Sequence, residues 1–189
     1  TWVGGKIGKA LSFDGVDDYV DIPGIENNPN QITQMAWVKT AYRGKWDWWG
    51  WNGWNVIMTK RQVDDESVWA TLAIWNEDPD SNNGHGVLQL DAQGYARPII
   101  QGPAVVNDGN WHHIAGVKNG CTYTVYVDGK FDSSYDDCNF SLNGIHNLHI
   151  GHHGAWNNFF NGEIDEVAVY YRALSPQEIF DKASPKLYE

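Results

Sequence analysis

Short runs of β-branched and aromatic residues, bounded by glycine, asparagine and aspartate, recur along the whole chain. Such runs are typical of β-strands, and about ten to twelve of them in one chain predict a two-sheet sandwich. The length of 189 residues fits one domain, and 20 glycines supply turns for many short strands. We expect an all-β domain over residues 1–189, with strands at residues 10–13, 19–22, 34–40, 56–60, 68–75, 86–91, 114–118, 122–127, 130–134, 148–151 and 164–171.

The run at residues 68–75 indicates which side of its sheet faces the core. Side chains alternate between the two faces of a strand, so every second residue shares a face. One face is aliphatic, with Val68, Ala70, Leu72 and Ile74. The other face carries Trp69, Thr71, Ala73 and Trp75. The aliphatic face suits the core, and the face with tryptophan and threonine suits the wall of a groove.

A hairpin with a cysteine at each end is predicted at residues 121–138. Asp128 and Gly129 separate two strand-like runs, and Asp-Gly favours a two-residue hairpin turn because both residues adopt positive φ. Cys121 and Cys138 would lie near the open ends of the paired strands. We expect a disulfide between them, which implies an oxidising compartment; the alternative is two buried thiols in a cytosolic protein.

One short helix is predicted near the end of the sequence. Ser175 and Glu178 have the spacing of a capping box, and Pro176 occupies the first helical position. Pro185 would end the helix. We expect this helix to seal one edge of the sandwich.

The charge balance excludes some classes of partner. The chain has 13 lysines and arginines against 24 aspartates and glutamates, a net charge of −11. Nucleic acids and anionic membranes bind basic surfaces, so we expect neither as a partner. No apolar run approaches the roughly 20 residues of a membrane span. The sequence opens at Thr1 without a charged leader, and we expect a module excised from a larger secreted or cell-surface protein.

Three groups of segments carry a family resemblance: residues 8–20, residues 110–117 with 125–130, and residues 160–167 with 170–175. In this order and spacing they resemble the laminin-G-like and pentraxin-like branch of the concanavalin A-like jelly rolls. The resemblance spans nearly the whole chain and implies two antiparallel sheets, one of them curved, with a concave face and rim loops. Domains of this kind serve as carbohydrate-binding modules, adhesion domains and enzyme appendages, so the fold does not define the function.

A tryptophan-rich segment departs from the family pattern. Five of the 11 tryptophans lie within residues 46–54, interleaved with aspartate and asparagine. The apolar faces of sugar rings stack on indole while their hydroxyls bind polar groups, and such a mixture suits a sugar site. The alternative is a small cluster that packs the loop onto the sandwich. We expect a carbohydrate site, with Trp75 as its platform on the sheet, formed by Arg43, Trp46, Trp48, Trp49, Trp51, Trp54, Trp75, Asn76, Arg97, His153 and Trp156.

An acidic turn at residues 14–18 suggests a calcium site. Calcium prefers carboxylate and carbonyl oxygens in a tight turn that contains glycine. The family resemblance implies a structural calcium between this turn and the last strand. We therefore expect Asp14, Asp17 and Asp165 as ligands. The alternative is that these carboxylates accept hydrogen bonds from turn amides.

The carboxylates of the last strand do not form a glycosidase pair. Jelly-roll glucanases carry E-x-D-x-E, which places three carboxylates on one face. Here Glu163 and Asp165 share a face, and Glu166 falls on the other. The two groups of a retaining site, about 5–5.5 Å apart, cannot be built from that spacing. A lyase could instead use residues without local spacing: His85, Tyr95, Arg97 and His153.

These observations favour a carbohydrate-binding module with no catalytic residues of its own. Its partners would be a polysaccharide or oligosaccharide and a glycan-degrading catalytic domain in the same parent chain. A small jelly-roll lyase or hydrolase is the first alternative. A cell-surface adhesion domain is the second.

Overall fold

The computed structural model describes residues 1–26, 30–47, 50–61, 69–77, 83–92, 95–138, 145–153 and 158–184. These residues form an all-β sandwich with one short helix, as predicted. The elements are β1 (Trp2–Gly4), β2 (Lys9–Asp14), β3 (Val20–Glu26), β4 (Gln31–Lys39), β5 (Lys45–Asp47), β6 (Gly50–Asn52), β7 (Trp54–Arg61), β8 (Trp69–Trp75), β9 (His85–Ala92), β10 (Tyr95–Val105), β11 (Trp111–Asn119), β12 (Thr122–Val127), β13 (Lys130–Asp136), β14 (Ile145–Ile150), β15 (Asn161–Tyr170) and α1 (Pro176–Ala183).

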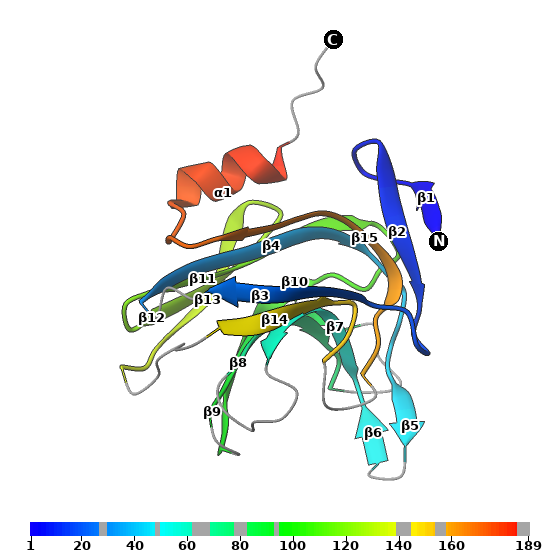
Figure 1. The fold of residues 1–189 in the computed structure, drawn as a ribbon, viewed down its shortest axis with the longest axis horizontal. Coiled ribbons are helices and arrows are strands. Elements are labelled where there is room, and N and C mark those ends of the chain that lie inside the picture. Colours follow the sequence, from blue (N-terminus) through cyan, green and yellow to red (C-terminus); the bar gives the residue numbers. More distant parts are fainter. Residues whose placement is uncertain are drawn as a thin grey trace.

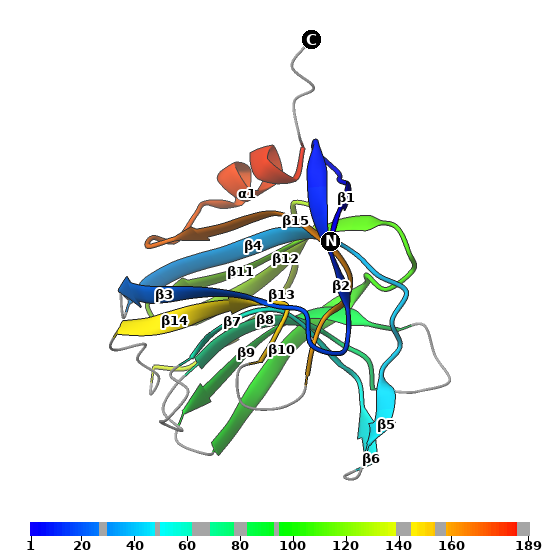
Figure 2. The same ribbon diagram turned by 45° about the vertical axis from the view of Figure 1, so that its right-hand side comes forward.

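Two antiparallel sheets lie face to face (Figure 1). The first, called sheet A, has the order β1-β2-β15-β4-β11-β12-β13. The second, sheet B, has the order β10-β9-β8-β7-β14-β3. Strands β5 and β6 form a separate hairpin that projects from one end of the sandwich (Figure 2). No helix in the described part of the chain is long and apolar enough to cross a membrane.

The main core lies between the two sheets. Ala70, Leu72 and Ile74 of β8 belong to it and are almost completely buried, which confirms the predicted inward face of this strand. Ala73 of the same strand lies on the opposite side, in a separate small cluster with Val87. The period of two in the sequence therefore assigned both faces of β8 correctly wherever its side chains are described.

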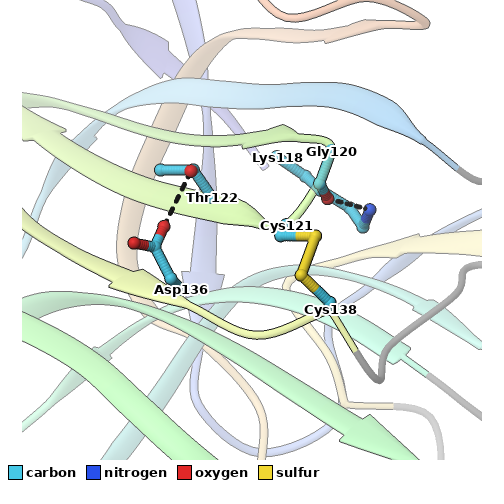
Figure 3. Close-up of a disulfide and its surroundings, with 6 residues drawn as sticks. All are labelled: Lys118, Gly120, Cys121, Thr122, Asp136 and Cys138. Carbon is cyan, nitrogen blue, oxygen red and sulfur yellow. Dashed lines mark hydrogen bonds between the residues drawn. A yellow bond between two sulfur atoms is a disulfide. The ribbon is translucent and has the colours of Figure 1, made fainter.

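The predicted hairpin and disulfide are both present (Figure 3). Asp128 and Gly129 have φ of 51° and 76°, the left-handed conformation that a type I′ turn requires. Cys121 and Cys138 are joined just beyond the paired residues Thr122 and Asp136, whose side chains form a hydrogen bond of 2.7 Å. The disulfide closes the open end of the hairpin at the edge of sheet A.

Removing this disulfide should destabilise the domain without changing its fold. The two cysteines are 17 residues apart, and closing such a loop in the unfolded chain contributes about 3 kcal/mol. The double variant Cys121→Ser, Cys138→Ser should lose about this free energy of unfolding in a denaturant titration. Wild-type protein in reductant serves as the control. An unchanged wild-type midpoint after full reduction would contradict the prediction.

Helix α1 covers a face of the sandwich, whereas the sequence predicted that it would seal an edge. It lies over β4 and β15 on the outer side of sheet A (Figure 1). Ile179 is completely buried there in a cluster with Met35 and Tyr126. The predicted capping box between Ser175 and Glu178 is present. The outer side of sheet A carries apolar residues, which are buried when the helix packs on them. For this reason the helix lies on the face of the sheet and not at an edge.

Three regions of strand escaped prediction from the sequence. Strand β1 is too short to show a strand pattern. Hairpin β5–β6 lies within residues 42–55, whose sequence is typical of a surface loop and therefore did not predict strands. Strand β10 contains Pro98 and Pro103, which interrupt the strand pattern. The structure tolerates both prolines because β10 is an edge strand of sheet B and its register with β9 shifts twice along its length.

A histidine joins the hairpin turn to the loop before β11. The two ring nitrogens of His112 lie 2.9 Å from Asp128 Oδ2 and 3.1 Å from Asp108 Oδ1. The hydrogen bond to Asp128 is the main reason that the pKa of His112 is raised. Asp108 stays ionised in acid, because hydrogen bonds from Asn110 chiefly lower its pKa to about 2.

The variant His112→Gln should therefore lose stability in a pH-dependent way. A raised pKa means that protonated His112 stabilises the folded state fully below pH about 6.5, and that this contribution is lost as the pH rises through the folded-state pKa. The difference in melting temperature between wild type and variant should be larger at pH 5.5 than at pH 9. An equal difference at both values would contradict the charged bridge.

Candidate functional site

Two tryptophans form a pair on the outer face of sheet B, the face turned away from the main core. Trp54 of β7 and Trp75 of β8 are opposite each other in the register. Their ring centroids are 4.7 Å apart and their planes are inclined by 44°. Both side chains are partly exposed, and they pack on the small cluster of Val56, Ala73 and Val87. The pair therefore offers aromatic surface to solvent from two paired strands.

The backbone beside this pair is held tightly. The amide of Asn76 donates to the carbonyl of Gly53 at 3.2 Å, which joins the ends of β7 and β8. A Cβ at Gly53 would overlap the carbonyl oxygen of Asn76, so only glycine fits here. The Asn76 side chain, 1% exposed, donates to the carbonyl of Arg43 at 2.8 Å. Asn76 thus fixes the backbone that leads into hairpin β5–β6.

A buried amide connects this region to the other sheet. Asn55 of β7 is 1% exposed, and its Nδ2 donates to Thr40 Oγ1 and to the carbonyl of Asn161, both at 3.2 Å. Its Oδ1 accepts from the amide of Asn161 at 2.7 Å. Asn52 of β6 donates to Asn158 Oδ1 at 2.6 Å. These contacts tie the base of hairpin β5–β6 to β7 and to the start of β15.

The structure places only some of the predicted sugar-binding residues. Trp54 and Trp75 come together as described, and Arg43 is exposed. Asn76 and His153 are buried. Three predicted residues lie outside the described part of the chain: Trp48, Trp49 and Trp156. For three others the structure describes the strand but not the side chain: Trp46 on β5, Trp51 on β6 and Arg97 on β10.

Polar side chains that were not predicted for the sugar site lie on or beside the strands next to Trp75. His85 of β9 is opposite Trp75 in the register, and its Nδ1 lies 3.1 Å from the carbonyl of Ala104. Gln101 of β10 donates to Glu77 Oε1 at 2.8 Å. Gln101 and Glu77 are 24 residues apart in the sequence, so their contact depends on pairing between distant strands and could not be predicted from local pattern.

The three carboxylates expected to bind calcium do not converge. Asp14 pairs with Asn161 across the strands, and Asp165 lies four residues further along β15. Asp14 Oδ1 accepts from the amides of Val16 and Asp17. The described residues contain no cluster of three or more histidine, cysteine or acidic side chains that could hold a metal. Calcium at this turn stays a prediction from the sequence, and no step below depends on it.

The acidic residues of β15 are engaged in structural contacts. Asp165 is buried and accepts from the amides of Ile7 and Glu166, each at 2.9 Å. Glu163 forms an ion pair with Lys39 at 3.3 Å. Glu166 is exposed at a bulge, with φ of 48°. Of the histidines considered for a lyase, His85 lies on β9 and His153 is buried, and the side chains of Tyr95 and Arg97 are outside the description.

The chain belongs to the concanavalin A-like lectin/glucanases superfamily, whose family model matches residues 14–180. No curated protein matches the sequence. Among solved structures, domain 4 of an extracellular GH43 arabinanase from Geobacillus stearothermophilus, in complex with arabinotriose, has a TM-score of 0.72. It is 23% identical, and the match covers 96% of this chain and 80% of that one.

Two further structures extend the similarity. A SAP-like pentraxin from Limulus polyphemus is 16% identical with a TM-score of 0.68, over 91% of this chain and 80% of that one. The CBM40 domain of the Ruminococcus gnavus IT-sialidase, bound to α2,3-sialyllactose, is 15% identical with a TM-score of 0.64. That match covers 87% of this chain and 98% of the CBM40 domain. At these identities the matches establish the shared fold.

The contact between Gly53 and Asn76 can be tested by adding one methyl group. Gly53→Ala should lower the free energy of unfolding by roughly 1–3 kcal/mol, because the ends of β7 and β8 must move apart. Gly4→Ala is the matched control, since a Cβ at Gly4 meets no atom within 4 Å. Equal denaturation midpoints for the two variants would contradict the tight approach.

Proposed function

We propose that this chain is a carbohydrate-binding module that holds an attached glycan-degrading enzyme on its polysaccharide. The observation that carries the proposal is the partly exposed Trp54–Trp75 pair on the outer face of sheet B. A sugar ring stacks its C–H face on indole, and two indoles on paired strands provide a wide aromatic surface. The family membership and the sugar-bound structures of the same fold support this proposal.

The surroundings of the pair suit the hydroxyl groups of a neutral glycan. Arg43, Glu77, His85 and Gln101 are polar residues near the ends of the strands that carry the pair. A net charge of −11 disfavours strongly anionic polymers through long-range repulsion. A shallow, hydrated site gains little beyond the cost of ordering, so we expect dissociation constants of order micromolar to millimolar.

The attached enzyme explains why weak binding is useful. A module joined to a catalytic domain raises the local concentration of that domain at the polymer surface. The Cys121–Cys138 disulfide and the fold shared with a domain of an extracellular arabinanase support a location outside the cytosol.

Substitution of the paired tryptophans should weaken binding to polysaccharide. Native affinity electrophoresis through gels containing soluble arabinan, xylan, mannan or mixed-linkage β-glucan should show retardation by at least one polymer. Trp75→Ala and Trp54→Ala should each raise the dissociation constant for that polymer about tenfold or more, because a stacking surface is lost. Trp2→Ala is the matched control, since Trp2 is 65% exposed on β1 of the other sheet.

The outcomes separate the competing functions. Full retention of binding by the Trp75→Ala protein would contradict this site. Migration unaffected by every polymer would overturn the proposed function. Shortening of a polymer by the purified chain would establish the enzyme alternative instead.

A further inference from the structure

A second group of aromatic rings lies at the corner between β2 and β3. Tyr19 is 54% exposed, and its ring centroid lies 5.5 Å from that of His152 and 6.5 Å from that of Phe159. His152 and Phe159 stack almost in parallel, with centroids 4.2 Å apart and an interplanar angle of 8°. The three residues, called here the Tyr19 cluster, present an exposed tyrosine ring beside a stacked pair.

Hydrogen bonds pair the backbone beneath the Tyr19 cluster. His152 and Phe159 form an antiparallel bridge, and the amide of Phe160 donates to the carbonyl of Gly151 at 2.8 Å. The amide of Gly151 in turn donates to the carbonyl of Ile57 on β7 at 2.9 Å. Rings held by paired backbone lose little freedom when a ligand binds, which is the condition for a preorganised site.

Two carboxylates lie two residues before and two residues after Tyr19 in the sequence. Asp17 lies in the preceding turn with its side chain exposed. Asp21 lies on β3, and its Oδ1 is 3.5 Å from Nδ1 of the buried His149. An aromatic face beside carboxylate acceptors is the chemistry that binds the apolar face and the hydroxyl groups of a sugar.

The Tyr19 cluster is linked to the Trp54–Trp75 pair by a chain of hydrogen bonds. The amide of Trp54 donates to Asn52 Oδ1 at 3.2 Å, and Asn52 donates to Asn158 at 2.6 Å. Asn158 directly precedes Phe159. The β2–β3 corner, hairpin β5–β6 and the start of β15 lie toward the same end of the sandwich (Figure 1). Both aromatic surfaces are therefore built on one connected scaffold.

We propose that the Tyr19 cluster is a second sugar-stacking subsite, which takes another sugar unit of the polysaccharide bound at the Trp54–Trp75 pair. This inference rests on the proposed function. It follows that the module recognises more than one sugar unit of a polymer rather than a single terminal residue. Longer oligosaccharides that reach both surfaces should bind more tightly than short ones, because the second contact is intramolecular once the first has formed.

The test compares tyrosine variants in the same four-polymer electrophoresis panel. Tyr19→Ala should raise the dissociation constant for the retarding polymer about tenfold, and Tyr19→Phe should restore most of the affinity because the ring is kept. Tyr135→Ala is the matched control, since Tyr135 is 44% exposed on β13 of the other sheet. Thermal melts of each variant report whether the fold is intact.

Spectroscopy of the wild-type protein covers the case in which Tyr19→Ala fails to fold. Aromatic NMR signals of Tyr19, His152 and Phe159 should shift on titration with oligosaccharides released from the retarding polymer. Signals that stay fixed while those of Trp54 and Trp75 move would overturn the second subsite and leave the proposed function standing. Absence of retardation by all four polymers would overturn both.

Discussion

The buried amide of Asn55 is the contact on which the aromatic end of this sandwich depends. A buried amide must find hydrogen-bond partners, because leaving one unpaired costs about 1–3 kcal/mol. Asn55 finds them on Thr40, which follows β4, and on the backbone of Asn161, where β15 begins. It therefore holds one end of sheet B against sheet A through polar contacts of fixed geometry. The hydrophobic core between the sheets is non-directional and could not by itself specify this alignment.

Features that depend on neighbouring residues could be predicted from the sequence, and features that depend on contacts between distant segments could not. Local rules placed most strands, both faces of β8 where described, the Asp128–Gly129 turn, the disulfide and the capping box, because each depends on neighbouring residues. Strand β10 was missed because its prolines oppose the local pattern and only its edge position permits them. In the candidate site, the place of Trp75 on the outer face follows from the alternation on its strand. The structural role of Asn76 and the separation of Asp14 from Asp165 depend on pairing between distant segments.

The fold of this chain tolerates wide differences in sequence. A pentraxin, a sialidase CBM40 domain and an arabinanase domain share the fold with this chain at 23% identity or less. What is common is the sandwich, and its core positions can be filled by many apolar side chains. Residues at strand ends and in loops can change without disturbing the core of such a fold.

The prolines of β10 have a consequence for molecules that crowd together. An edge strand normally offers a row of free amide donors to which a strand of another molecule can pair. Pro98 and Pro103 have no amide hydrogen, and the amide of Ala104 donates instead to the carboxylate of Asp132 on β13 at 3.1 Å. The β10 edge of sheet B is thereby a poor template for intermolecular pairing. Molecules at high local concentration therefore gain few backbone hydrogen bonds by pairing along β10.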